Sequence, residues 1–165
     1  MNKEALLTLY YRGSRDGWMA EDFHCLCDDK AQTLTLLQIE DGDCIGGYTN
    51  QSWSSPDKEE EEKSDSGAIL FNLTSRTSFP CRGHRWAITC WKSWGPSFGG
   101  FGELGVVEEP FNGKDACWSF ADRGGYKIPM NYEGINMLTN NKCDMYRRCL
   151  FTINSIEVWG VRFKD

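Results

Sequence analysis

The chain has 165 residues, of which 40% are hydrophobic and 13% are aromatic, so it can bury the core of one domain and is too apolar to be disordered. Its formal net charge is −6, and Arg147-Arg148 is its basic pair. Nucleic acids and anionic membrane surfaces both attract positively charged proteins, so both are disfavoured as partners. A protein with basic patches remains compatible with this charge.

Eight cysteines are distributed along the chain, which has no apolar signal-peptide core at its N-terminus. No apolar run approaches the roughly 18 residues that a membrane span needs. We therefore expect an intracellular, cytoplasmic protein without direct membrane insertion, in which the cysteines are free thiols. These cysteines are Cys25, Cys27, Cys44, Cys81, Cys90, Cys117, Cys143 and Cys149.

The first elements along the chain are a packed apolar segment and a helix. Residues 5–10 are apolar and predict a short helix or strand, and Asp16-Gly17 is a turn signal. We expect an amphipathic helix over residues 18–27, because four apolar side chains recur there at helical spacing. They are Met19, Phe23, Leu26 and Cys27.

A β-hairpin is predicted next. Residues 33–39 and 44–48 are typical of strands, and Asp41-Gly42 between them is the strongest hairpin signal in the chain. Gly46 and Gly47 lie side by side in the second strand. Adjacent glycines there indicate a bulge or a close approach of another backbone.

Residues 54–66 are a charged run without apolar side chains. The sequence predicts a solvated loop, with residues 57–65 as an acidic insertion, and a docking loop for a basic partner is the alternative. Beyond it, short apolar segments alternate with glycine-rich loops. Strands are predicted at 68–73, 86–91, 106–107 and 117–120, a loop at 74–85, and irregular structure at 130–147 with a helical turn around Met137.

The last segment, residues 151–163, has apolar residues on both sides, which predicts a strand covered on both faces near the centre of a sheet. One face is expected to carry Ile153, Glu157, Trp159, Val161 and Phe163, and the other Ile156 and Val158. Short strands dominate the chain. We therefore expect an α+β, β-rich fold in one domain spanning residues 1–165: two antiparallel sheets packed as a sandwich with about two flanking helices.

The sequence contains weak signals for three kinds of site: a nucleotide-binding loop, a metal site and a hydrolytic site. Residues 100–105 match G-x-G-x-x-G, but Pro110 and two acidic residues follow, which argues against a phosphate-binding helix. Cys25 and Cys27 would diverge on a helix, so they cannot share one metal. Hydrolysis by a nucleophilic side chain needs a histidine, and the chain has two: His24, expected to cap or line the helix, and His84 in a polar loop.

Glu157 is the remaining catalytic candidate, because it lies inside an apolar strand. A buried carboxylate is costly unless it is paired or hydrogen-bonded. We expect a structural acid bonded to an arginine or to loop amides, and a functional acid with a raised pKa is the alternative. The sequence predicts neither a cofactor nor a metal site, and we expect that the protein is not an enzyme.

Several segments together resemble the TLDc domain family, and the likeness covers nearly the whole chain. They include residues 9–18, 20–24, 27–28, 33–35, Gly46 to Trp53, 68–71, Gly95 to Gly100 and 156–159. The resemblance implies a two-sheet sandwich with two helices and no established catalytic mechanism. On it we also expect Gly46, Gly47, Trp53, Gly99, Gly100 and Glu157 to contribute to binding.

The chain departs from the family pattern at two places. Met19 stands where relatives often have a serine before the first helix, so we expect Asp16 to cap that helix instead. Phe101-Gly102-Glu103 replaces a frequent Gly-His-Asp, which weakens acid–base or metal chemistry at that loop.

The resemblance implies a non-enzymatic interaction module that binds a large intracellular complex. The family is associated with the vacuolar-type proton ATPase and with protection against oxidative stress. Two alternatives stay open. One is a structural subunit of another assembly, cytoskeletal or organellar, and the other is a protein whose thiols act directly as antioxidants.

Overall fold

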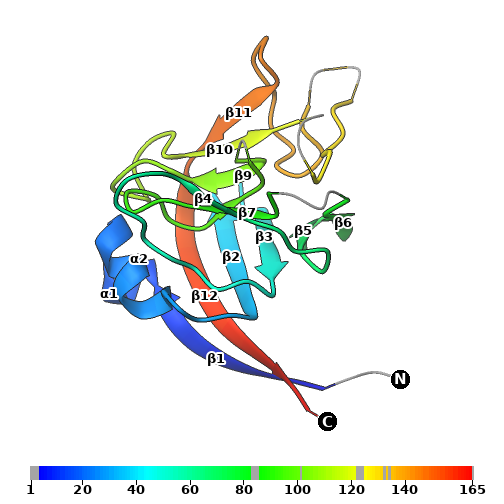
Figure 1. The fold of residues 1–165 in the computed structure, drawn as a ribbon. Helices are drawn as coiled ribbons and strands as arrows, with labels where there is room; N and C mark the ends of the chain where they lie inside the picture. The colour runs from blue at the N-terminus through cyan, green and yellow to red at the C-terminus, as the bar shows by residue number, and fades with distance from the viewer. Residues whose placement is uncertain are drawn as a thin grey trace.

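The computed structural model describes residues 4–82, 86–100, 102–121, 125–131, 133 and 135–164. Within them the chain forms two antiparallel six-stranded sheets and two helices (Figure 1). This confirms the expected β-rich sandwich with two helices.

The first sheet holds the long strands and has the order β1-β12-β2-β3-β5-β6. The strands are β1 (Ala5–Arg12), β12 (Ile153–Phe163), β2 (Thr33–Ile39), β3 (Cys44–Thr49), β5 (Ile69–Asn72) and β6 (Thr77–Pro80). The predicted hairpin is confirmed: β2 pairs with β3, and Gly42 takes a φ of 100° in the turn between them. A positive φ is accessible to glycine without steric cost, which explains the Asp-Gly pair.

The second sheet holds short strands and has the order β11-β10-β9-β8-β7-β4. The strands are β11 (Arg148–Phe151), β10 (Cys117–Phe120), β9 (Leu104–Val106), β8 (Ser97–Phe98), β7 (Ile88–Cys90) and β4 (Glu61–Lys63). Two predicted loops are therefore corrected. Residues 61–63 of the acidic run form the edge strand β4 on β7, and residues 77–80 form β6 on β5.

The N-terminal apolar segment is strand β1, followed by α1 (Gly13–Asp16) and α2 (Ala20–Cys27), which lie against one side of the sandwich (Figure 1). The prediction that Asp16 caps α2 is wrong, because the Asp16 carboxylate accepts the backbone N–H of Arg12 at 2.8 Å. The N-terminus of α2 is instead bonded by Glu109, whose Oε1 accepts the N–H of Ala20 at 2.6 Å. The Asp22 carboxylate also accepts the N–H of Met19 at 3.0 Å, so a local and a distant acidic residue together bond this end of the helix.

Strand β12 lies between β1 and β2, as expected for a strand inside a sheet. The predicted burial of both its faces is wrong. Ile156 and Val158 are buried against the core, whereas Glu157 and Trp159 are partly exposed on the outer face. A register shift between Ile153 and Ser155 also turns Ile153 into the core, away from the face on which alternation had placed it.

A chain of aromatic side chains crosses the core between the sheets and α2. Phe23 of α2 contacts Tyr11 of β1 edge to face, with ring centroids 5.8 Å apart, and contacts Trp53 at 5.6 Å. Trp53 contacts Phe98 of β8 at 5.7 Å, and Phe98 contacts Tyr126 at 6.5 Å. All five are buried, so this row joins the helix to both sheets.

Candidate functional site

The two adjacent glycines of β3 lie where other groups approach closely. A Cβ atom on Gly46 would lie 2.0 Å from the Thr35 carbonyl oxygen, and one on Gly47 would lie 2.6 Å from the Phe98 ring. Gly46 therefore permits the approach of β2, and Gly47 permits the packing of the second sheet on the first. The close-approach interpretation of this glycine pair is confirmed.

The other family positions are also engaged in packing. Trp53 is 1% exposed, and its indole N–H donates to the Thr33 hydroxyl at 2.9 Å. Gly99 has a φ of 86°, and a Cβ atom on Gly100 would lie 2.9 Å from the Trp86 ring. The structure thus gives all of them a role in shaping the core, and a binding role stays a prediction.

Glu157 lies on the outer face of β12 with both carboxylate oxygens bonded. Oε1 accepts from Arg12 Nε at 2.9 Å, and Oε2 accepts from Trp159 Nε1 at 2.8 Å. The expected bond to an arginine is therefore present, although the side chain is 25% exposed rather than buried. A carboxylate held by two fixed donors at the surface is typical of a structural acid.

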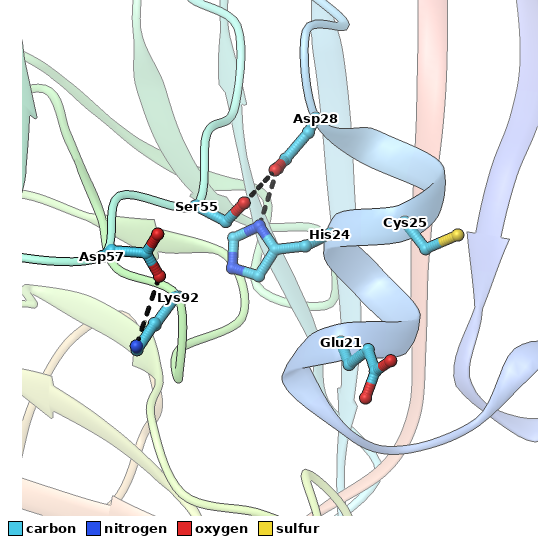
Figure 2. A pocket seen from close by; sticks show the side chains of 7 residues that line it. All are labelled: Glu21, His24, Cys25, Asp28, Ser55, Asp57 and Lys92. Atoms are coloured by element: carbon cyan, nitrogen blue, oxygen red, sulfur yellow. Dashed lines mark hydrogen bonds and ion pairs between the residues drawn. The ribbon is translucent and has the colours of Figure 1, made fainter.

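A polar depression of about 410 Å³ lies beside α2 (Figure 2). We call it the α2 pocket. Sequence reasoning had weighed His24 and Cys25 as reactive residues and had placed Asp57 in the acidic insertion, but it had not joined these residues with the others into one site. Asp28 could have been found, because it follows His24 by four residues on a helix. The lining residues are Glu21, His24, Cys25, Asp28, Ser55, Asp57 and Lys92.

Both ring nitrogens of His24 face hydrogen-bond acceptors. Nδ1 lies 2.7 Å from Asp28 Oδ1, and Nε2 lies 3.0 and 2.9 Å from the carbonyl oxygens of Trp91 and Trp94. Carbonyl oxygens only accept, so Nε2 carries a hydrogen that the two carbonyl groups share. The ring is only 7% exposed, so no nitrogen faces the pocket as a free base.

The polar residues of the α2 pocket are not ordered as a hydrolytic triad. Ser55 Oγ donates to Asp28 Oδ2 at 2.6 Å, so the aspartate lies between the serine and the histidine (Figure 2). In a serine hydrolase the histidine is in the middle and accepts the serine proton. The Cys25 side chain points away from His24 in the same view, so these two do not form a thiol–imidazole pair.

The bonds of His24 instead connect separate parts of the fold. Through Asp28 and Ser55 the imidazole joins α2 to the segment before β4, and through the Trp91 and Trp94 carbonyls it joins α2 to the loop after β7. At the outer rim, Lys92 pairs with Asp57 at 3.3 Å, with both side chains largely exposed. The pocket is therefore a structural junction with a charged rim.

The remaining sequence motifs give no binding site among the residues that the structure describes. After Gly100 the chain enters strand β9 rather than a helix, so the structural context of a dinucleotide fingerprint is missing. Cys25 is exposed and Cys27 is buried, in agreement with their predicted divergence. Over the described ranges, no three His, Cys, Asp or Glu side chains converge as metal ligands. Phe101 and His84 lie outside the described residues.

The helices that the structure describes are all too short or too polar to cross a membrane. In comparisons with known proteins, the TLDc domain family matches residues 2–162, which is nearly the entire chain. No curated protein matches the sequence.

Proposed function

Because the chain belongs to the TLDc domain family, we propose that it is a non-enzymatic protein-binding module of a large intracellular complex. The vacuolar-type proton ATPase is the partner that the family suggests, and oxidative-stress protection is the process in which binding would act. We place the module in the cytoplasm, at an organelle surface or on the cytoskeleton through its partner.

The observation that carries this proposal is the closed hydrogen bonding of the α2 pocket. Its histidine has acceptors on both nitrogens, and its serine is bonded to the carboxylate rather than to the imidazole. Acyl transfer needs an activated nucleophile next to a base, and this arrangement supplies neither. Recognition by the surface is then the function that these residues support best.

An acidic strip beside the α2 pocket is the surface that we assign to the partner. Residues 57–62 are all exposed and carry five carboxylates and one lysine. Pairing of β4 with β7 holds the second half of this strip on the edge of the sheet. Carboxylates in a row attract a basic surface and raise its association rate. The partner patch is therefore expected to be rich in lysine or arginine.

The test is recovery of the partner from native lysate by the purified chain, with the strip neutralised as Glu59→Gln, Glu60→Gln and Glu62→Gln. Among the residues that the structure describes, these three exposed side chains have no hydrogen-bond or ion-pair partner, so the fold should persist, as judged by circular dichroism. We expect recovery of one complex by the native chain and a loss of at least tenfold in the triple variant, more severe at low salt.

A matched control removes three carboxylates elsewhere, as Glu40→Gln, Asp41→Asn and Glu108→Gln, all exposed and outside the strip. It changes the net charge equally and should retain the complex. Equal loss in both triple variants would assign binding to net charge and reject the strip. Recovery unchanged in both would reject it as well.

A permanent structural subunit is the second candidate, favoured by a different surface. The outer ends of β1 and β12 form a ribbon on which Leu6, Leu7 and Phe163 are 50%, 52% and 44% exposed. Exposed apolar groups of this size are typical of obligate interfaces. A Leu7→Lys variant that loses the complex, while the neutralised strip keeps it, would favour this second candidate.

A further inference from the structure

Two cysteines meet at the end of the molecule where the chain turns into β11. Cys143 Sγ and Cys149 Sγ lie 2.6 Å apart. The two sulfur atoms are therefore in direct contact. The turn between them, residues 144–148, extends beyond the body of the sandwich at the top of the view (Figure 1). We call it the tip turn.

The backbone of the tip turn sets the two cysteines opposite each other. The N–H of Asp144 donates to the Arg148 carbonyl at 2.9 Å, and the N–H of Arg147 donates to the Asp144 carbonyl at 3.0 Å. Arg147 has a φ of 64°, as in a three-residue hairpin loop that ends with a left-handed residue. Asp144 and Arg148 are therefore the last hydrogen-bonded pair before the loop.

The next pair, Cys143 and Cys149, is then a non-hydrogen-bonded cross-strand pair. Such pairs have Cα atoms about 4.5 Å apart with their side chains close together. This separation lies within the ~4.4–6.8 Å that disulfide geometry allows. A bond between the two sulfurs therefore needs little movement of the backbone.

The side chain of Asp144 holds the tip turn in this form. Its carboxylate accepts the backbone N–H groups of Tyr146 at 2.8 Å and Arg148 at 3.0 Å. These bonds, with the Arg148 guanidinium, hold the pKa of the Asp144 carboxyl below its usual value. These bonds hold the turn in the geometry that sets the two thiols opposite each other.

The two thiols differ in access. Cys149 is buried, which raises the pKa of its thiol, and this thiol donates to the Asn141 carbonyl at 3.2 Å. Cys143 is half-buried and borders a turn whose residues 144–147 are exposed. A small oxidant can therefore reach Cys143 first, while Cys149 is protected behind it.

We propose that Cys143 and Cys149 are a peroxide-reactive dithiol that closes to an intramolecular disulfide. In the first step the Cys143 sulfur attacks a hydroperoxide, the O–O bond breaks, and a sulfenic acid and an alcohol (or water) form. In the second step the Cys149 sulfur attacks the sulfenic sulfur, the S–O bond breaks, and water leaves with the Cys149 proton. The peroxide gains the two electrons that the thiols lose, and a cellular dithiol reverses the bond by exchange.

The test is titration of the purified, reduced full chain with hydrogen peroxide, followed by intact mass and disulfide mapping. We expect the first oxidation to remove the mass of two hydrogen atoms and to map to Cys143–Cys149. Cys143→Ser should abolish that product. Cys149→Ser should stop at a Cys143 sulfenic acid that dimedone traps, because the second sulfur is missing.

The matched control is Cys25→Ser, which removes an exposed thiol on α2 and should leave the product unchanged. Oxidation that starts at Cys25, or a disulfide between other cysteines, would overturn the proposal. So would resistance of the native chain at peroxide levels that oxidise glutathione. The peroxide assay contains no partner protein, so a negative result would reject the dithiol proposal without bearing on the binding proposal.

Discussion

The two sheets of this domain are held together in different ways. The first contains strands of four to eleven residues, joined by long hydrogen-bond ladders such as β12 with β1 and β2. The second contains strands of two to four residues, and β7 meets β8 at a single pair. Short strands share few backbone hydrogen bonds. The second sheet therefore also depends on side chains that form hydrogen bonds or pack between its strands and loops.

The largest expected effect comes from the aromatic contact that joins the sheets. Phe98→Ala would remove the ring that packs on Trp53, Tyr126 and Gly47, and we expect a loss of about 3–5 kcal/mol in the free energy of unfolding. Urea denaturation measures it. Phe163→Ala, at an exposed site of the first sheet, is the control and should cost far less. Equal losses in the two variants would mean that the Phe98 contact between the sheets stabilises the fold no more than an exposed aromatic side chain does.

Asn136 tests the dependence of the second sheet on side-chain hydrogen bonds. Its Nδ2 donates to the Ser119 hydroxyl of β10 at 3.0 Å, and its Oδ1 accepts from the N–H groups of Leu138 and Thr139. The side chain is fully buried, so Asn136→Ala would leave these partners unsatisfied, at a cost of about 2–3 kcal/mol.

Thermal unfolding of Asn136→Ala, compared with the exposed Asn112→Ala, measures this effect. Hydrogen exchange should then locate the loss of protection in β10 and its neighbours and leave the β2–β3 hairpin protected. Uniform loss over both sheets would show that they unfold as one unit.

Asp65 tests the connection between the sheets through pH. Burial alone would raise the pKa of this carboxyl, but hydrogen bonds from Asn50, Thr49 and Gly67 together outweigh it and keep the pKa below its usual value. A carboxyl with a lowered folded-state pKa stabilises the fold above about pH 4, and this contribution is lost as the pH falls through the folded-state pKa.

We expect Asp65→Asn to lower the unfolding free energy by about 1–2 kcal/mol at neutral pH and to weaken its decline in acid. Chemical denaturation at a series of pH values checks both effects. Glu60→Gln, an exposed neighbour in the acidic strip, is the control and should follow the native curve. If the unfolding free energies of the native and Asp65→Asn proteins fell in parallel as the pH is lowered, Asp65 would not contribute to the acid sensitivity of the fold.

The smallest expected effect is at Glu157 on the outer face of the first sheet. Glu157→Gln would weaken the ion pair with Arg12, and a partly exposed pair of this kind contributes less than about 1 kcal/mol. Calorimetry should therefore find nearly unchanged stability. A variant that folds normally but loses partner binding would move this face of β12 into the interface, whereas loss of a newly found activity would restore the catalytic interpretation.

The contrast between the sheets also explains how much the sequence could predict. Strand β2 alternates buried and less buried residues and ends at Asp-Gly, so the first sheet's hairpin was predictable. Strands β4 and β6 have three and four residues, too few for a period, and the side chains of β4 are charged because it is an edge strand. The direction of Ile153 was missed because a register shift breaks alternation without a sequence signal.

The candidate site divides in the same way. The His24–Asp28 contact is local and follows from helical spacing. The carbonyls of Trp91 and Trp94, and Ser55, reach the pocket through tertiary structure and could not be predicted. Pairing of Cys143 with Cys149 depends on a turn whose left-handed residue is an arginine, which carries no turn signal.

The pairing of β1 with β12 joins the two ends of the chain, and Lys164 N–H donates to the Glu4 carbonyl at 2.9 Å (Figure 1). This ladder has the greatest sequence separation in the fold, so its closure should come late and slow folding. During synthesis on the ribosome, strand β1, in which residues 5–11 are uncharged, emerges before its partner strand β12 has been made. Until β12 is available, residues 5–11 lack the strand with which they pair in the folded protein, and their apolar side chains stay exposed.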